Sequence, residues 1–518
     1  MHKKIKLALL ISVLLAQPLF AKDVTLFYTN DLHAHVDPWI NPVVDKARPV
    51  GGFATIAGVV NQAKQTEKNV YFFDAGDYFT GPYLSLLTKG EAIADIMNTM
   101  PYDAISVGNH EFDHGVPNMV AQLKKIKYPV LLGNVYYKKS GERVIDKPWT
   151  IVERDGLKIG VIGIHGKFAF YDTIAASMIT DVEARDEIPE IKQAVAALKG
   201  KVDLIVLLIH EGVPGRQSSF GNKDVARLLQ ADIDTAKAVS GIDVLITGHA
   251  HAGTPEPIKV GNTLIVSTDA YATNLGKLVL DFNPETKKID GYKGELITMF
   301  ADSYKADAKV QQEINRWEDK LKTITAQVVG HTPVTLTRSY GESSPLGNLI
   351  MDAGMAQAPD AVAAFQNSGG IRADLEKGDI TYGSVISAYP FNNDITTMDL
   401  TGSDITSLMV HATNLTNGIL QVSKNVKVVY DSRKPLNQRI VSFTIDGKAV
   451  ESTKTYRIMT NSFCATGGDG YEAFLRGKNV KTMSGTTSAQ ALVDYFKRHD
   501  PVQPDNTKRV LDVASTLN

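Results

Sequence analysis

Short apolar runs recur through the first half of the chain, and each gives way abruptly to polar residues. The runs are rich in β-branched and aromatic residues and cover 24–29, 70–73, 104–107, 204–209 and 244–247. Helix-length segments such as 187–199 lie between them. Buried strands that alternate with helices have this pattern, because a strand covered on both faces is apolar throughout. The first half is therefore predicted to be an α/β sandwich.

The polar residues that follow these runs are of the types that bind metal ions. Open α/β sheets place their sites at the carboxyl ends of the strands, so we expect these side chains to meet at one place. They are Asp31, His33, Asp77, Asn109, His210, His249 and His251. A glycine precedes Asp77, Asn109 and His249, which would let the backbone approach an ion closely.

The donor types indicate which metals would bind. Carboxylate, imidazole and amide oxygen together suit borderline divalent ions, whereas Mg²⁺ and Ca²⁺ sites are mostly oxygen. These donors are too many for one tetrahedral ion, and two ions that share one carboxylate would use them all. We therefore expect two divalent metal ions, with Zn²⁺ or Mn²⁺ as the first choice and Co²⁺, Fe²⁺ or Mg²⁺ as alternatives. Such a pair can clamp the attacking and leaving oxygens of a phosphoryl transfer.

One amphipathic helix is predicted over residues 306–327. Its apolar positions recur at alternating spacings of four and three, at Val310, Ile314, Trp317, Leu321 and Ile324. The helix lies beyond the last of the metal-type residues, so we interpret it as a connector between two domains.

The C-terminal part, from about residue 330, carries no metal motif. Its polar and aromatic residues gather near glycines in the segments 366–372, 389–393 and 461–470. Asn367 and Arg372 could offer amide and guanidinium donors to an anion, and Phe391 and Phe463 could enclose a planar base. Taken alone, these segments favour a plainer interpretation as core aromatics and glycine turns.

The strand-end residues of the first half resemble the signature of calcineurin-like metallophosphoesterases. The matching segments are Asp31-x-His33, Gly76-Asp77, Gly108-Asn109-His110-Glu111, His210 and Gly248-His249-x-His251. The resemblance implies a four-layer α/β/β/α sandwich with two metals bridged by Asp77. One metal would be held by Asp31, His33, Asp77 and His251, and the other by Asp77, Asn109, His210 and His249. The resemblance also implies that His110 is the catalytic histidine, and that Asp113 orients it and raises its pKa.

The second half resembles the C-terminal domain of the 5'-nucleotidase family, an α/β domain that binds substrate. This resemblance implies that Asn367 and Arg372 meet the substrate, that Phe391 and Phe463 grip the base, and that Asp469 lies at the ribose. Asn109 is expected to contact substrate as well as metal. In the family the two domains rotate about the linking helix. The expected divisions are a metallophosphoesterase domain at 22–303, the linking helix at 304–329 and the C-terminal domain at 330–518.

The expected function is that of a secreted binuclear-metal 5'-nucleotidase, which hydrolyses nucleoside 5'-monophosphates to nucleoside and phosphate. One position departs from the family pattern, since Tyr340 stands where an arginine usually lies seven residues before Gly347, with Arg338 nearby as a substitute. This leaves open a 2',3'-cyclic-nucleotide 2'-phosphodiesterase with 3'-nucleotidase activity, a UDP-sugar hydrolase and, more distantly, a sulfur-ester hydrolase. An alternative of another class is a catalytically inactive periplasmic nucleotide-binding protein. The sequence argues against this alternative, because every expected metal position carries a residue that can bind a metal.

The remaining histidines have no required role in these motifs. His35 and His114 lie beside the motif residues and are interpreted as structural or supporting residues. His165 follows a strand-like run at 157–164 and is expected to line the wall of the site rather than to bind metal. The others are expected at the surface or in the core: His331, His411 and His499.

The N-terminus has the order of a signal peptide. Lysines at positions 3, 4 and 6 precede an apolar run over 7–15, and the segment Ala16-Gln17-Pro18-Leu19-Phe20 leads to Ala21. Cleavage near Ala21 would place the protein in the periplasm or outside the cell. The apolar run is too short to span a bilayer, so no membrane anchor is expected. Cys464 is the only cysteine, which excludes an intrachain disulfide.

Composition narrows the choice of partner. With 518 residues, of which 43% are apolar, the chain has material for more than one domain. The formal charge is −2, and loss of three lysines with the signal peptide makes it −5. This balance does not favour binding to duplex nucleic acid, which demands a basic surface, whereas a small nucleotide needs only a local positive site. The sequence leaves the oligomeric state open.

Overall fold

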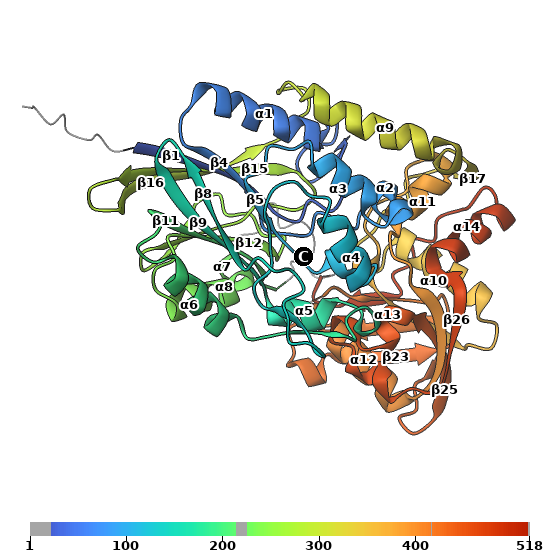
Figure 1. Cartoon of the computed structure of the whole chain (residues 1–518). Helices are drawn as coiled ribbons and strands as arrows, with labels where there is room; N and C mark the ends of the chain where they lie inside the picture. The colour runs from blue at the N-terminus through green and yellow to red at the C-terminus, as the bar shows by residue number, and fades with distance from the viewer. Residues whose placement is uncertain (1–21, 214–224, 416, 516–518) are drawn as a thin grey trace, which may run out of the picture.

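The computed structural model describes residues 22–213, 225–415 and 417–515 (Figure 1). The predicted signal peptide, residues 1–21, lies outside the described residues. None of the described helices combines the length and the apolar character that a membrane crossing requires.

The first sheet of the N-terminal part has the order β16-β15-β1-β4-β5-β6. Strands β1, β4, β5 and β6 are parallel, and β15 joins β1 in the antiparallel sense. The strands are β1 Lys22–Thr29, β4 Val70–Asp74, β5 Ala104–Ser106, β6 Val130–Leu131, β15 Asn274–Asn283 and β16 Lys288–Thr298.

The second sheet has the order β13-β14-β12-β11-β9-β8. Its central strands β9, β11, β12 and β14 are parallel. The strands are β8 Trp149–Arg154, β9 Leu157–His165, β11 Leu204–Glu211, β12 Val244–His249, β13 Ile258–Val260 and β14 Thr263–Val266. All five apolar runs singled out in the sequence are therefore strands in the interior of one sheet or the other.

The two sheets pack face to face, and alternation along each strand divides its side chains between two cores. In β1, Leu26 lies in the core between the sheets, whereas Phe27 lies in the core under the helices. In β11, Val206 belongs to the inter-sheet core and Leu207 to the core on the opposite side. Side chains of a strand point alternately to its two faces, so strands that are apolar throughout fit between two apolar layers.

Helices cover the outer face of each sheet, which completes the four-layer α/β/β/α sandwich (Figure 1). The first sheet is covered by α1 Phe53–Thr66, α3 Glu91–Met97 and α4 Val116–Leu123. The second is covered by α6 Glu187–Leu198 and α8 Gln230–Ala238. The shorter helices α2 Tyr83–Thr88, α5 Lys167–Thr173 and α7 Val225–Leu228 lie in the connections. Short strand pairs β2 Pro38–Trp39 with β3 Val50–Gly51 and β7 Val135–Tyr137 with β10 Val182–Ala184 complete this part.

Helix α9, Ala308–Thr325, connects the two parts of the chain and lies along α1 (Figure 1). The Asp307 side chain caps its N-terminus by accepting bonds from the backbone amides of Lys309 and Val310. Four of the five apolar positions expected on its buried face are buried. The prediction is wrong for Ile324, which is 48% exposed, because the last turn buries Thr325 against Gly383 of the C-terminal part instead.

The C-terminal part is also built on a layered α/β plan. Its main sheet has the order β21-β18-β25-β20-β26, and a second sheet has the order β24-β23-β22-β27. β17 Val328–Thr332 and β19 Gly378–Thr381 form a separate pair. The strands of the two sheets are β18 Ala363–Asn367, β20 Asp394–Thr401, β21 Leu420–Val422, β22 Val426–Tyr430, β23 Ile440–Ile445, β24 Lys448–Ala449, β25 Thr455–Asn461, β26 Lys478–Thr487 and β27 Val510–Asp512.

Alternation again separates two cores on the faces of the main sheet. Met459 of β25 packs on one side with α10, α11 and α14, whereas Ile458 packs on the other with α12 and the second sheet. The helices are α10 Pro345–Gln357, α11 Tyr382–Ala388, α12 Gly402–Ala412, α13 Ser462–Ala465 and α14 Ser488–Arg498. The expected two-domain α/β architecture is confirmed.

Candidate active site

The strand-end side chains of the two sheets meet in one buried cluster. Nε2 of His210 lies 3.1 Å from Oδ2 of Asp77, and Nε2 of His33 lies 3.0 Å from Nε2 of His251. Nδ1 of His249 lies 2.9 Å from Oδ1 of Asn109. Asp31 completes the cluster, with Oδ1 3.4 Å from Nε2 of His251. The structure thus brings together every residue expected as a metal ligand, and their role as ligands stays a prediction.

The backbone at this cluster is unusual. Five of the seven residues are in the left-handed region, where residues with a side chain are uncommon: Asp31, His33, Asp77, His249 and His251. Each such residue costs of order 1 kcal/mol or more, and a fold keeps them only where the surroundings impose them. The loops therefore keep an unfavourable backbone conformation that directs these side chains toward one point.

Glu111 holds two of these loops together. Its buried carboxylate accepts hydrogen bonds from the amides of Asp77, Phe79 and Gly108, at 3.0, 2.9 and 2.6 Å. Gly108 has no room for a side chain, since a Cβ there would lie 2.2 Å from Oδ1 of Asp77. Glycine at this position therefore lets the backbone pass close to the Asp77 side chain, and a close approach to an ion stays a prediction.

Hydrogen bonds turn the free nitrogens of two imidazoles toward the cluster. Nδ1 of His33 lies 3.0 Å from the carbonyl oxygen of Thr80, and Nδ1 of His210 lies 2.8 Å from that of Ala75. A carbonyl only accepts, so each Nδ1 carries a proton, and each Nε2, when it is not protonated, offers a lone pair to the cluster. Nε2 of His249 is buried without a hydrogen-bond partner. These lone pairs and the carboxylates of Asp31 and Asp77 fit divalent cations.

The groups divide into two sets of donors that share one residue. Asp31, His33 and His251 form one set, and Asp77, His210 and His249 form another, with the donor atoms of each set within 4.8 Å of one another. Asp77 also lies in a set with His33 and His110, so it reaches both sides. The donor arrangement therefore fits two ions bridged by Asp77.

Electrostatics in the cluster also favour cations. Burial lowers the pKa of the His33 imidazole, and the Arg372 guanidinium lowers it further, so His33 is neutral. Burial also lowers the pKa of His210, but Asp77 and Asp31 outweigh it and raise this pKa to about 10. Without a metal, His210 thus takes up a proton to balance the two carboxylates, and a metal ion would displace that proton.

His110 stands beside the cluster and is held by a carboxylate. Its Nδ1 lies 2.7 Å from Oδ2 of Asp113, which also accepts a 2.7 Å bond from the Thr80 hydroxyl. Burial lowers the pKa of His110, but Asp113 and Asp77 more than offset this, so the pKa lies above its usual value. The arrangement gives an imidazole with a fixed ring orientation that can donate a proton from Nε2.

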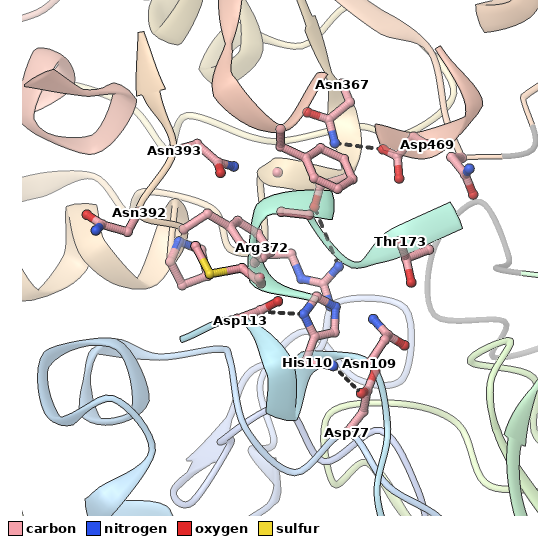
Figure 2. Close-up of a pocket in the computed structure, with 18 of the residues that line it drawn as sticks. Asp77, Asn109, His110, Asp113, Thr173, Asn367, Arg372, Asn392, Asn393 and Asp469 are labelled. Atoms are coloured by element: carbon pink, nitrogen blue, oxygen red, sulfur yellow. Dashed lines mark hydrogen bonds and ion pairs between the residues drawn. The ribbon is translucent and has the colours of Figure 1, made fainter. Parts of the chain in front are cut away.

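A cavity of about 310 Å³ separates this cluster from the C-terminal domain. Figure 2 shows His110 and Asp113 on one side of it, Asn367 and Asp469 on the other, and Arg372 reaching from the C-terminal domain toward His110. The two halves of the expected site therefore face each other across one space.

Arg372 is the buried cation of this cavity. Its Nη2 lies 3.2 Å from Nε2 of His33, and its Nη1 donates a 3.3 Å bond to the hydroxyl of Tyr340. Nε is buried with no hydrogen-bond partner. A guanidinium has five N–H donors, so this one has donors to spare for an anion in the cavity.

Asp469 and Asn367 form the polar end of the C-terminal side. Nδ2 of Asn367 donates a 2.7 Å bond to Oδ2 of Asp469, and Asn461 donates to the amide oxygen of Asn367. Burial raises the pKa of Asp469 to about 7. Asp469 is itself in the left-handed region, at φ 58°.

Both expected aromatic residues line the cavity. The ring of Phe391 lies 5.8 Å from that of His110, in the loop after α11, whereas Phe463 lies in the short helix α13 and rests on Gly468. Both rings also pack against the hydrophobic cores of the C-terminal part, and their role in enclosing a base stays a prediction.

The other histidines divide between site and surface. His35 is buried, with Nδ1 bonded to the carbonyl of His33, and His165 is buried behind His210. His114, interpreted from the sequence as a supporting residue, lines the cavity itself. His331 and His499 are exposed, and His411 donates from Nε2 to the carbonyl of Asp469.

Two residues near the domain interface escaped sequence reasoning. Tyr271, before β15, packs its ring 5.4 Å from those of His33 and His251. Asp172 of α5 accepts a 3.0 Å bond from Asn417 across the domain interface. Neither residue belongs to a sequence motif. The structure alone shows that each one lies where the two domains meet. Arg338, the suggested substitute for the missing arginine, is absent from the described lining of the cavity.

Comparison with known proteins agrees with this architecture. Residues 24–253 match the family model of the calcineurin-like phosphoesterase, and residues 328–476 match that of the 5'-nucleotidase C-terminal domain. The chain is 29% identical to an apyrase from Tabanus yao, over 92% of this chain and 91% of that protein. It is 28% identical to a 5'-nucleotidase from Mus musculus, over 93% and 89%. A 5'-nucleotidase precursor from Thermus thermophilus has a TM-score of 0.83, at 26% identity over 95% and 99%.

A buried Asp/His/Asn cluster at the strand ends of a two-sheet sandwich, next to a carboxylate-anchored histidine, defines a metal-dependent phosphoester hydrolase. The calcineurin-like domain is followed here by a 5'-nucleotidase C-terminal domain. The chain belongs to the 5'-nucleotidase family.

Proposed function

We propose that this protein is an exported 5'-nucleotidase, which hydrolyses nucleoside 5'-monophosphates to nucleoside and phosphate. The observation that carries the proposal is the single cavity between His110 with the Asp/His cluster on one side and Arg372, Asn367 and Asp469 on the other. A nucleotide has a phosphate at one end and a base at the other, and the cavity offers matching groups at both.

The metal ions belong to the N-terminal side. Asp31, His33, Asp77 and His251 would hold one, and Asp77, Asn109, His210 and His249 the other, with Zn²⁺ or Mn²⁺ as the proposed ions. When bound, such ions withdraw charge from the phosphoryl group and favour ionisation of the attacking water. The chain itself keeps each donor in the protonation state that metal binding requires, and it orients all of these donors toward one place.

His110 serves the leaving group. Its Nδ1 is occupied by Asp113, so Nε2 is the atom that gives a hydrogen bond or proton to the oxygen that departs. Asp113 is fixed in turn by Thr80, which prevents the pair from rotating out of the cavity. We propose His110 and Asp113 as the catalytic pair.

Arg372 and Asn109 bind the phosphate from opposite domains. The spare donors of Arg372 suit phosphoryl oxygens, and Arg binds these more specifically than Lys because its fork is planar. Charge that develops on the phosphoryl oxygens is thereby neutralised in a buried space, where fixed donors act most strongly.

The nucleoside is bound by the C-terminal domain. Phe391 and Phe463 would enclose the base, a contact of about 1 to 3 kcal/mol per stacked ring with little preference among bases. Asp469 and Asn367 would accept from and donate to the ribose hydroxyls. Because the cavity lies between the two domains, we propose that they rotate about α9 to admit substrate, with domain limits of 22–303 and 330–518.

Export is part of the proposal and rests on the signal-like residues 1–21, together with the precursor status of the Thermus thermophilus relative. Fractionation of cells that express the full chain should recover a protein beginning near Lys22 outside the cytoplasm. A chain lacking residues 1–21 should stay inside.

The activity is tested with the mature protein, stripped by a chelator and then supplied with Mn²⁺ or Zn²⁺. Phosphate release is measured from AMP, 3'-AMP, 2',3'-cyclic AMP, a nucleotide sugar and bis(p-nitrophenyl) phosphate. We expect metal-dependent release that is fastest from AMP and that falls by ~10² to 10⁴-fold in His110→Ala. If another ester is hydrolysed faster than AMP, the protein is a phosphoesterase with a different preferred substrate. Nucleotide that binds without being hydrolysed would contradict the proposal.

A further inference from the structure

We propose that Asn417, held by Asp172 of the opposite domain, is a hydrogen-bond acceptor that selects nucleotides whose two ribose hydroxyls are both free. The proposed substrate class is thereby narrowed to ribonucleoside 5'-monophosphates that carry no ester at the 2' or 3' position. The inference rests on the proposed function, because it takes the cavity as the place where the nucleoside binds.

Asp172 and Asn417 meet across the boundary between the two domains. Asp172 belongs to α5 of the N-terminal domain, and Asn417 precedes β21 of the C-terminal domain. Nδ2 of Asn417 donates a 3.0 Å bond to Oδ2 of Asp172. Both residues are half-buried, and Asn417 lines the cavity. The bond therefore links the N-terminal domain to a side chain that a bound nucleoside can reach.

The Asp172 carboxylate fixes the orientation of the Asn417 amide. An ionised carboxylate only accepts hydrogen bonds, so a reversed amide would put its oxygen against the carboxylate and lose the bond. Burial raises the pKa of Asp172, but the bond from Asn417 stabilises its ionised form. With Nδ2 turned to Asp172, Oδ1 of Asn417 is left as an acceptor, and none of the described residues donates to it. The cavity thus gains an acceptor rather than a donor at this place.

Two contacts place this acceptor near Asp469, at the proposed ribose end of the cavity. A Cβ on Gly470 would lie 3.5 Å from Oδ1 of Asp172, so this carboxylate rests against the residue that follows Asp469. The Tyr471 hydroxyl donates a 3.3 Å bond to the carbonyl of Gly418, the residue after the acceptor. The two segments are therefore in contact, and both line the same cavity.

A ribose with both hydroxyls free supplies the donors that these groups require. Oδ2 of Asp469 accepts from Asn367, which leaves Oδ1 of this carboxylate for one hydroxyl and Oδ1 of Asn417 for the other. Each hydroxyl carries one proton. An ester or a hydrogen atom in place of a hydroxyl removes that proton and leaves an acceptor unpaired, which a polar site penalises.

The bond also couples recognition of the ribose to closure of the domains. Asp172 moves with the N-terminal domain and Asn417 with the C-terminal domain, so a rotation that separates the domains breaks the bond and lets the amide turn. The acceptor is oriented only when the nucleoside is held beside His110 and the Asp/His cluster. Discrimination among sugars is therefore expected in the closed arrangement, where hydrolysis takes place.

The inference is tested with AMP, 2'-deoxy-AMP and 3'-deoxy-AMP. In the metal-loaded parent we expect a higher kcat/KM for AMP than for either deoxynucleotide. Asn417→Ala should lower one of these two ratios about 3- to 10-fold, the size of one neutral hydrogen bond, and Asp172→Ala should lower the same ratio. Asp172→Asn keeps an acceptor for the Asn417 amide and should retain more of the preference than Asp172→Ala. The double alanine variant should lose no more than Asn417→Ala, because both side chains act through one contact.

Asn61→Ala is the matched control. Nδ2 of Asn61 donates a 2.9 Å bond to Asp307, and neither residue lines the cavity, so this variant should keep the parental ratios. p-Nitrophenyl phosphate has no ribose and distinguishes recognition of the sugar from a clamp between the domains. Losses as large for this ester as for AMP, or unchanged ratios in folded variants, would overturn the inference.

Binding without turnover separates this inference from the proposed function. The three nucleotides are titrated by calorimetry into the same variants after removal of metal by a chelator. The same changes in the ratios of Kd would support the inference even if AMP is not the preferred ester. If the parent binds AMP no more tightly than both deoxynucleotides, the inference fails, whereas rapid hydrolysis of AMP would leave the proposed function standing.

Discussion

Replacing Gly108 by alanine should damage the metal cluster without touching any ligand. A Cβ at this position would lie 2.2 Å from Oδ1 and 2.5 Å from the amide nitrogen of Asp77, the residue common to both sets of donors. Real Cβ atoms do not approach other atoms closer than about 3.0 Å, so Asp77 must move by about 0.8 Å. Metal–ligand distances tolerate only about 0.2 Å, and a displacement near 1 Å costs on the order of 10²-fold in rate.

We therefore expect Gly108→Ala to lose at least ~10-fold in metal affinity and ~10²-fold in kcat. Gly341→Ala is the matched control, since a Cβ there meets nothing within 4 Å and φ is not positive. Both variants are stripped, titrated with Zn²⁺ by calorimetry and assayed for phosphate release. Equal metal affinity and rate in the two variants would refute the argument that Asp77 is held in place through contact with Gly108.

Three further results are expected. His110→Ala should lower kcat for AMP by ~10² to 10⁴-fold, whereas Phe463→Ala should mainly raise KM, and equal losses of kcat in steady-state assays would contradict this division. Trp317→Ala should lower the free energy of unfolding by about 3 to 5 kcal/mol, because Trp317 of α9 is 2% exposed. Ile324→Ala on the same helix should change it by less than about 0.5 kcal/mol in denaturant titrations. Chelation should lower Tm and abolish turnover, and added Mn²⁺ or Zn²⁺ should restore both. A Tm that does not change when metal is removed or added would contradict metal binding at the buried cluster.

The connecting helix shows where a local pattern stops being sufficient. The spacing of apolar residues located α9 and its buried face to within two residues at each end. At its last turn the pattern predicted Ile324 as buried, but the neighbouring domain contacts Thr325 through Gly383, and this contact decides the orientation. A helix end that meets another domain is set by that domain as much as by its own sequence.

The candidate ligands could be predicted from the sequence because each lies at or shortly after the carboxyl end of a buried strand. Parallel strands bring their carboxyl ends to one edge, so residues as distant as Asp31 and His251 had to converge. The role of the glycine before Asn109 could also be predicted, because its place at the end of a strand is a feature of the local sequence. By contrast, Glu111 was part of a motif, and its role in binding the amides of Asp77, Phe79 and Gly108 was visible only in the structure.

The sequence by itself determined the α/β class, the strand ends and the residue types gathered there, because these follow from periodicity along a single strand or helix. Only the tertiary structure decided which residues of the two domains meet. Tyr271, Tyr340 and Arg372 come from distant segments and share no pattern, yet Arg372 lies beside the Tyr271 ring and donates a hydrogen bond to the Tyr340 hydroxyl. Such contacts depend on how two packed bodies close on each other, and no local spacing of apolar and polar residues encodes that arrangement.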